Sequence, residues 1–282
     1  MKKSETILAP VLNGFSQVIL QENKWSGLLI IAGIALGNWV LAVAGLIAAI
    51  CANITARALV LPIKNNASGL YSFNAILVGM VMLILFKNTW ETWCFVAIGS
   101  IATVLMQHFF MKFNIPGYTF PFISITWMIV ALGNPVLESG GISIRHYVFE
   151  NQYFINASLN NFSEIFFQSN VLSGVFFILA LLIGDVKSGI FAVITSGLVV
   201  GIAWIMKQSE HEIELGIYGF NAILTLIALI QSRKKTLLKI SAGVILTVFV
   251  NIICIETNVL DALGGALTFP FVLSTWVISA IK

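Results

Sequence analysis

Charged side chains are scarce in this 282-residue sequence. Only 10% of the residues are charged, with 15 Lys+Arg and 12 Asp+Glu, whereas 59% are apolar. A soluble domain has about 25% charged and 45–50% apolar residues. So few charges cannot coat a water-soluble protein of this size, and the composition therefore predicts a polytopic membrane protein. Ten membrane spans would use roughly 200 residues, which excludes a large soluble catalytic domain.

Cysteine is nearly absent, and this excludes further classes. Cys51, Cys94 and Cys254 lie singly in apolar stretches, whereas a disulfide framework or a metal site needs clustered ligands. The basic residues are too scattered for a nucleic-acid surface, and we expect no cofactor and no metal. The apolar run after Lys3 is interrupted by Asn13 and lacks a small-x-small cleavage site, so we expect the N-terminus to be retained.

Long apolar segments make up most of the chain. Two further apolar pieces, 6–20 and 159–169, are too short and too polar to cross a hydrocarbon core of about 30 Å. We therefore predict an all-α polytopic membrane protein with ten transmembrane helices and two half-membrane pore helices. The ten predicted spans are 25–42, 43–60, 69–86, 90–111, 116–135, 171–186, 188–206, 215–231, 236–255 and 263–281.

The sequence repeats itself at a shift of about 147 positions. At a shift of 147, Phe15 to Asn23 falls on Phe162 to Asn170, and Tyr71 to Leu77 falls on Tyr218 to Leu224; at a shift of 149, Thr119 to Phe122 falls on Thr268 to Phe271, and Trp127 on Trp276. Each copy holds five spans, and five is odd, so the second copy enters the membrane from the opposite side. We predict a first repeat at 1–140, an external junction at 141–158 and an inverted second repeat at 159–282, with a pathway between the repeats.

Basic residues predict the orientation of the chain. With an internal N-terminus, the internal side holds eleven of them: Lys2, Lys3, Arg57, Lys64, Lys112, Lys187, Arg233, Lys234, Lys235, Lys239 and Lys282. The external side holds Lys87, Arg145 and Lys207. This excess of basic residues on one side predicts that both termini are cytoplasmic.

Each short piece carries one strongly polar side chain at the same place, Gln17 in the first copy and Glu164 in the second. A carboxyl group inside a membrane segment is costly unless it is paired or hydrated. An interfacial residue at a helix end is the competing interpretation, and it is weakened because the polar side chain recurs. Leu20 and Phe167 follow three residues later, so we expect each to share a helix face with its polar neighbour.

Aromatic and aliphatic side chains recur one helical turn apart in both copies. The pairs are Phe73 with Leu77 and Phe220 with Leu224, beside Asn74 and Asn221 respectively. Ordinary helix packing accounts for most such stripes, but it does not readily explain why this one recurs in both halves. We therefore expect these rings to form the walls of a flat slot.

A third recurring block places threonine before proline. Thr119 precedes Pro121, and Thr268 precedes Pro270. Proline removes a backbone donor, so we expect both spans to be broken near their starts. Carbonyl oxygens freed by such a break, together with the threonine hydroxyls, are tolerated where they line a cavity.

These groups predict the chemistry of a solute. Acceptor oxygens and flat rings suit a small, planar, neutral molecule rich in N–H donors, whereas anions lack a cationic partner and hydrated cations would lose their shell. Urea, with four N–H donors in one plane, fits this description. Formamide, acetamide and ammonia fit it less well, and residue spacing does not choose among them.

The sequence resembles the urea transporters of bacteria and animals. The resemblance rests on Gln17-x-x-x-Gln21-x-Asn23 and its copy from Glu164, on both Tyr-x-Phe-Asn-x-x-Leu blocks, and on the Pro-x-x-Thr-x-Pro-Phe block. It covers nearly the whole chain. It implies passive, channel-like urea permeation through a pore in each protomer, a homotrimer, and a bacterial inner membrane location.

By motif match, the resemblance also implies a set of pore residues. Two urea sites would lie at the half-helices, with a constriction between them. The site residues are Gln17, Val18, Phe73, Glu164, Ile165 and Phe220, and the constriction residues are Leu77, Leu224, Thr119 and Thr268. Leu20 stands where the family usually has an aromatic residue, opposite Phe167 in the second copy, and Gly265 replaces the first proline of its block.

Three alternatives remain beside this interpretation. An ion-coupled transporter for a small neutral amide or ammonia needs titratable groups deep in the spans, but Arg57, His108 and Asp185 lie near span ends and do not recur. A water or glycerol channel of the aquaporin type needs Asn-Pro-Ala twice, and only Asn134-Pro135-Val136 is present. A membrane enzyme needs a metal cluster or a catalytic dyad, and neither is visible.

Overall fold

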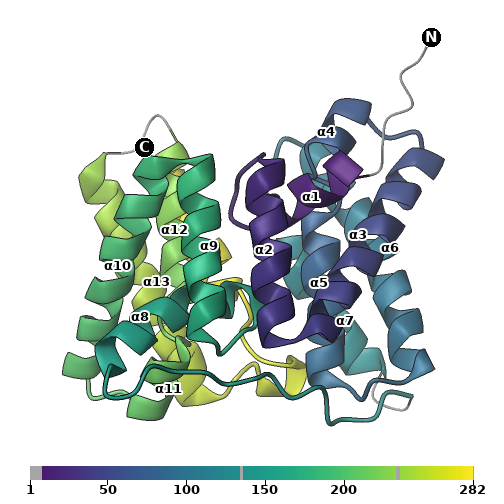
Figure 1. Cartoon of the computed structure of the whole chain (residues 1–282). Helices are drawn as coiled ribbons and strands as arrows, with labels where there is room; N and C mark the ends of the chain where they lie inside the picture. Colours follow the sequence, from purple (N-terminus) through teal and green to yellow (C-terminus); the bar gives the residue numbers. More distant parts are fainter. Residues whose placement is uncertain (1–7, 134–135, 233–235, 282) are drawn as a thin grey trace.

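The protein is an upright bundle of helices (Figure 1). Its structure, a computed structural model, describes residues 8–133, 136–232 and 236–281. Helices account for 75% of the residues that the structure describes, and these residues contain no strand. Six of the eleven basic residues assigned to the internal side (Lys2, Lys3, Arg233, Lys234, Lys235 and Lys282) lie outside the described residues.

Ten apolar helices lie at the ten predicted positions. Four of them are long and apolar enough to cross a membrane: α3 (Trp39–Ala58), α6 (Trp90–Lys112), α10 (Val186–Ile205) and α13 (Leu237–Thr257). The six shorter ones are α2 (Lys24–Gly37), α5 (Phe73–Leu85), α7 (Phe120–Gly133), α9 (Val171–Gly184), α12 (Phe220–Gln231) and α14 (Phe269–Ala280). Helices of 12–14 residues rise only about 20 Å. The described residues therefore form a polytopic membrane protein, and ten complete crossings stay a prediction.

Four of the shorter helices, α5, α7, α12 and α14, begin later than predicted because turns precede them. The expected span 69–86 begins as a helix only at Phe73, because Gly69 has a φ of +84° and reverses the chain there. The expected span 116–135 begins only at Phe120, after Tyr118 with a φ of +46°. The predicted breaks near Pro121 and Pro270 are confirmed, since both prolines lie in the first turn of α7 and α14, where a missing N–H costs nothing.

Asparagine and aspartate side chains set the starts of four helices. Asn23 Oδ1 accepts from the backbone N–H groups of Trp25 and Ser26 at the start of α2. Asn170 does the same at the start of α9, and Asn38 and Asp185 cap α3 and α10. Each acceptor satisfies an N–H group that the first helical turn leaves without a partner.

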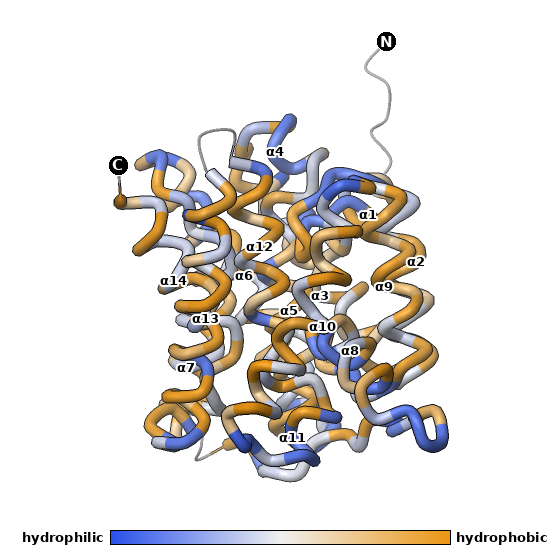
Figure 2. The backbone as a smooth tube through the Cα atoms, turned by 90° about the vertical axis from the view of Figure 1, so that its left-hand side faces the viewer, coloured by the Kyte–Doolittle hydropathy of each residue, from blue (hydrophilic) through white to orange (hydrophobic). Residues whose placement is uncertain are grey.

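The helix bounds recur at the shift found in the sequence. α2 and α3 coincide with α9 and α10 when their numbers are raised by 147. The same shift relates α4 (Ile63–Ala67) to α11 (Glu210–Leu215), and these two lie at opposite ends of the bundle (Figures 1 and 2). The left-handed backbone recurs as well, since Gly69 and Gly216 share a φ of +84°.

The contact between α2 and α9 joins the two halves by paired hydrogen bonds. Ser26 Oγ donates to the Ala180 carbonyl at 2.7 Å, and Ser173 Oγ donates to the Gly33 carbonyl at 2.7 Å. At the shift of 147 positions, Ser26 corresponds to Ser173 and Gly33 corresponds to Ala180. Gln21 Nε2 adds a bond to the Leu181 carbonyl at 3.0 Å. The two serine bonds are therefore reciprocal, and all three of these donors are uncharged.

Apolar side chains cover the outer flanks of the long helices. Ile54, Leu105, Ile194 and Ile253, one on each of the four long helices, are more than half exposed. Hydrophilic residues concentrate at the two ends of the bundle, while the residues between these ends are mostly hydrophobic (Figure 2). An apolar surface of this extent indicates contact with lipid.

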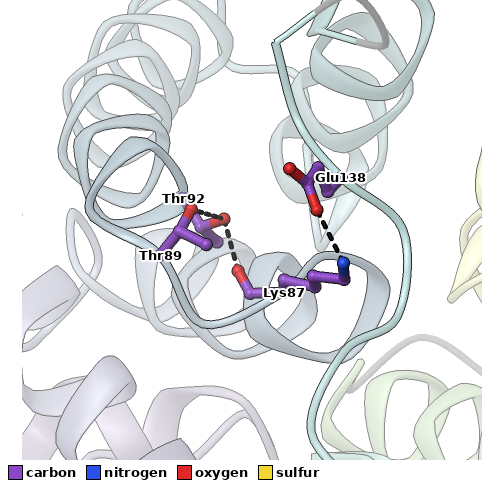
Figure 3. Close-up of polar contacts among 4 residues, drawn as sticks. All are labelled: Lys87, Thr89, Thr92 and Glu138. Carbon is purple, nitrogen blue, oxygen red and sulfur yellow. Dashed lines mark hydrogen bonds and ion pairs between the residues drawn. The ribbon is translucent and has the colours of Figure 1, made fainter.

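An extended strap, residues 136–152, runs along one end of the bundle (Figure 1). Lys87 Nζ lies 2.6 Å from the Glu138 carboxylate, beside the bond from Thr92 Oγ1 to the Lys87 carbonyl (Figure 3). The Lys87 ammonium lowers the pKa of the Glu138 carboxyl below its ordinary value. Farther along the strap, Asn38 Nδ2 donates to the Ser143 carbonyl at 3.0 Å. The strap is thus bonded to loops of the first half.

Two glycines allow close contact between each half-helix and the helix that follows it. A Cβ atom on Gly27 would lie 1.9 Å from the Leu12 carbonyl oxygen, and one on Gly174 would lie 2.2 Å from the Leu159 carbonyl oxygen. We expect Gly27→Ala and Gly174→Ala each to cost about 1–3 kcal/mol of folding free energy, because backbone must move. The measurement is the apparent melting temperature of the detergent-solubilised protein.

Gly197 provides the matched control, because a Cβ atom there meets nothing within 4 Å. Gly197→Ala lies in a helix interior, so its melting temperature should equal or exceed that of the wild type. Equal melting temperatures for Gly27→Ala and Gly197→Ala would contradict the close contact.

Candidate functional site

The two short polar pieces are half-helices that end inside the bundle. The first is α1 (Leu8–Gln17), and the second is α8 (Tyr153–Ser163), extended by the 3-10 turn η1 (Glu164–Phe166). Gln21 N–H donates to the Ser16 carbonyl and Gln168 N–H to the Ser163 carbonyl, each at 3.0 Å. These bonds close both half-helices in the same way.

The expected sharing of a helix face is wrong for Leu20 and Phe167. Leu20 lies beyond the end of α1 with a φ of +59°, and Phe167 lies beyond η1 with a φ of +57°. The left-handed backbone turns the chain away at the residue that was expected to continue the helix. Both side chains are nevertheless partly buried, and the Phe167 ring centroid lies 6.1 Å from that of Phe122 on α7.

Gln17 and Glu164 are both partly buried at the ends of their half-helices. Gln17 Nε2 donates to the Ser68 carbonyl at 3.0 Å. The Glu164 carboxylate has no hydrogen-bond or ion-pair partner among the residues that the structure describes. Four lone-pair positions on its oxygens therefore stay available to an N–H donor.

Apolar walls flank both half-helix ends. Val18 and Ile165, next to the polar pair, are buried. The predicted one-turn pairing is confirmed, since Phe73 and Leu77 lie on α5 and their counterparts lie on α12, all four buried. These counterparts are Phe220 and Leu224. α1 packs against α5 and η1 packs against α12, so each half-helix contacts the helix that carries the apolar pair of its own half.

Thr119 and Thr268 meet between the halves. Their Oγ1 atoms lie 2.7 Å apart and form a hydrogen bond, and both residues are buried. Each threonine follows a residue in left-handed backbone, Tyr118 or Leu267, and precedes the first residue of α7 or α14. The sequence named both threonines, but it gave no sign that they bond to each other.

Sequence reasoning noted Asn74 and Asn221 only as companions of the apolar stripe. Both are buried, and their Nδ2 atoms donate to the carbonyls that directly precede the two threonines, at 3.3 Å for Tyr118 and 3.1 Å for Leu267. The signal for these residues was their recurrence at a shift of 147.

No group of three His, Cys, Asp or Glu side chains among the described residues is arranged to hold a metal ion, and Cys51, Cys94 and Cys254 are free thiols. A cavity of about 290 Å³ lies where the strap meets the junction of α2 and α3, and its lining includes Trp39 and Arg145 but none of the predicted site residues.

The fold and the site define the class of protein. Broken helices, paired polar contacts between two halves and an apolar exterior describe a polytopic membrane protein with its polar groups turned inward. The urea transporter family profile matches residues 8–282, and the chain belongs to that family. Its members are transporters and channels rather than enzymes.

Curated relatives agree with the family assignment. The chain is 25% identical over 240 residues to urea transporter 1 of Rattus norvegicus, covering 78% of this chain and 62% of the relative. It is 24% identical to urea transporter 1 of Mus musculus and 25% identical to that of Ovis aries, with the same coverage. The chain thus spans less than two thirds of the length of these relatives.

Proposed function

We propose that the chain conducts urea passively across a membrane, by a channel-like path between its two halves. The observation that carries this proposal is the partly buried Glu164 carboxylate, which has no partner among the described residues. A carboxylate in such a place is unfavourable unless water or a ligand supplies donors. Family membership agrees with urea as the ligand.

The path would follow the approximate two-fold axis of two inverted halves. The reciprocal bonds of Ser26 and Ser173 support this symmetry, and so do α4 and α11 at opposite ends of the bundle. The bond between Thr119 and Thr268 joins equivalent atoms of the two copies, as a bond on this axis would. The constriction would lie there, with Gln17 toward one mouth and Glu164 toward the other.

The acceptors along this path match the N–H groups of urea. In the threonine pair one hydroxyl donates to the other, and both oxygens keep lone pairs that can accept from a solute. Gln17 uses its Nε2 on Ser68, which leaves Oε1 as an acceptor. We propose that Val18, Leu20, Phe73, Leu77, Ile165, Phe167, Phe220 and Leu224 supply the apolar walls. Walls without charge admit a neutral, flat solute and leave a hydrated ion without its shell.

A shrink–swell assay on proteoliposomes tests the proposed function. We expect rapid urea flux, slower flux of thiourea, formamide and acetamide, and little flux of glycerol. Dissipating proton and sodium gradients with ionophores at a fixed urea gradient should not change the urea rate, because no ion is coupled. A urea rate equal to that of empty vesicles would refute the proposal, and a rate that collapses with the ionophores would show ion coupling.

Glu164→Ala removes the unpaired acceptor. Solute N–H groups would lose about 1–3 kcal/mol of hydrogen bonding, so we expect urea flux to fall about tenfold or more in stopped-flow assays. Glu164→Gln is the matched control, since it keeps a carbonyl acceptor of the same shape and Gln17 occupies the equivalent position in the first half. We expect it to retain most of the flux. Wild-type flux in a folded Glu164→Ala protein would contradict the role of the carboxylate.

Thr119→Val and Thr268→Val each keep the side-chain shape and remove one oxygen from the constriction. We expect each to slow urea flux about three- to tenfold, on the scale of one hydrogen bond. Thr126→Val is the control, because Thr126 is buried on α7, the helix that begins directly after Thr119, and its hydroxyl has no partner among the described residues. Equal rates for the Thr119→Val, Thr268→Val double variant and the control would exclude the threonines from the path.

A further inference from the structure

We propose that Asn74, Asn221, Trp127 and Trp276 are positioning residues that together set the two threonine oxygens at the constriction and thereby the preference for urea over smaller amides. This inference rests on the proposed urea path. It concerns four side chains that act on backbone carbonyls rather than on the solute.

The two asparagines hold the break from within their own half. Asn74 Nδ2 donates to the Tyr118 carbonyl at 3.3 Å, and Asn221 Nδ2 donates to the Leu267 carbonyl at 3.1 Å. Each carbonyl belongs to the peptide group whose nitrogen is that of Thr119 or Thr268. A shift of that peptide group therefore moves the threonine directly.

The asparagines are themselves held by a further amide. Asn74 Nδ2 also donates to Gln107 Oε1 on α6 at 3.2 Å, and Asn221 Nδ2 donates to Asn251 Oδ1 on α13 at 3.1 Å. Both Nδ2 hydrogens are thereby used in each half. The direction of each carboxamide is consequently fixed by a helix that does not carry the break.

The two tryptophans hold the break from the opposite half. Trp127 Nε1 on α7 donates to the Gly265 carbonyl at 3.0 Å, and Trp276 Nε1 on α14 donates to the Pro116 carbonyl at 2.7 Å. Pro116 and Gly265 both lie three residues before their threonine. Each break is therefore anchored at two carbonyls, one by its own half and one by the other.

Each tryptophan ring also packs against a phenylalanine ring of the other half. The Trp276 ring centroid lies 5.1 Å from that of Phe120, and the Trp127 centroid lies 5.6 Å from that of Phe269. Phe120 and Phe269 directly follow the threonines. Each tryptophan therefore contacts one break on both sides of its threonine, at the carbonyl three residues before it and at the ring directly after it.

Backbone conformation shows why such anchoring is needed. Tyr118 has a φ of +46° and Leu267 a φ of +51°, a left-handed region that L-residues with a side chain seldom adopt. Such conformations persist only where the surroundings over-determine them. The hydrogen bonds from asparagine and tryptophan hold the break in this conformation. Removing one of them therefore lets the break relax and the threonine hydroxyl move away from its partner.

The halves differ in a way that selects the test variant. Asn74 Oδ1 also accepts from Phe122 N–H at 3.1 Å, at the start of α7, whereas Asn221 Oδ1 is buried without a partner among the described residues. Asn74 thus also supports a helix start. Asn221→Leu removes only the two donations and is the cleaner probe.

We expect Asn221→Leu to lower the ratio of urea to formamide permeability about threefold or more in proteoliposomes, because urea has twice as many N–H groups to place on the two oxygens. A general folding defect would lower both permeabilities in the same proportion and leave the ratio unchanged. Asn53→Leu is the matched control, since Asn53 is equally buried but donates only to Ala49 of its own helix. Its ratio should equal that of the wild type.

Coupling to the threonine is tested by a double variant. If Asn221 acts through Thr268, the Asn221→Leu, Thr268→Val protein should show the ratio of Thr268→Val alone, because the two changes affect one interaction. Independent, multiplying effects would overturn the positioning role. An unchanged ratio in folded Asn221→Leu would overturn it as well.

Trp276→Phe provides a second probe that keeps the ring packing and removes only the Nε1 donor. We expect the ratio to fall in the same direction, and this variant decides the question if Asn221→Leu is not recovered as folded protein. An unchanged ratio in Trp276→Phe would then overturn the proposal. The absolute urea rate of the wild type reports separately on the proposed function, and a wild-type rate no higher than that of empty vesicles would overturn both.

Discussion

Helix ends inside a membrane impose the constraint on which the rest of this structure depends. A helix that stops within the hydrocarbon exposes carbonyl and N–H groups that lipid cannot satisfy. This chain stops α1 and η1 inside the bundle and begins α7 and α14 after a break. Protein donors satisfy carbonyl groups at these ends and breaks. Gln231 Nε2 donates to the Leu20 carbonyl at 2.9 Å, and Trp276 Nε1 donates to the Pro116 carbonyl at 2.7 Å. The interior is organised around these carbonyls.

The constraint also explains the low content of charge. The groups that satisfy the broken helices are amides, hydroxyls and indole N–H groups, such as those of Ser26, Asn74 and Trp127. Neutral donors cost far less to bury than ammonium or guanidinium groups. A path lined in this way presents dipoles instead of net charge. Few charges therefore predict the membrane, and they also agree with a solute that is itself neutral and forms hydrogen bonds.

Sequence patterns predicted the ten apolar segments, the half-helices and the recurring blocks, because apolar periodicity and repetition are written in consecutive residues. The starts of α5, α7, α12 and α14 lie four to six residues after the predicted ones, since left-handed residues such as Tyr118 resemble ordinary helix formers. Leu20, beyond the end of α1, misleads in the same way. The shared face of Gln17 and Leu20 failed for that reason. The bond from Ser26 to the Ala180 carbonyl was beyond prediction, because a backbone acceptor has no side-chain signature and the partner lies 154 residues away. The fold was therefore more predictable than the geometry that orients the site.

The difference between Gln17 and Glu164 follows from their neighbours. Gln17 Nε2 donates to the Ser68 carbonyl, and a carboxylate in its place would set two acceptors against each other with no hydrogen between them. An amide is therefore required at the end of α1. The Glu164 carboxylate faces no such demand, since no protein acceptor pairs with it among the described residues, and an acid is tolerated there. The two mouths of the proposed path thus differ in their acceptor groups for a local reason, with an amide at one and a carboxyl group at the other. An approximately symmetric pore can in this way present its strongest acceptor at one end only.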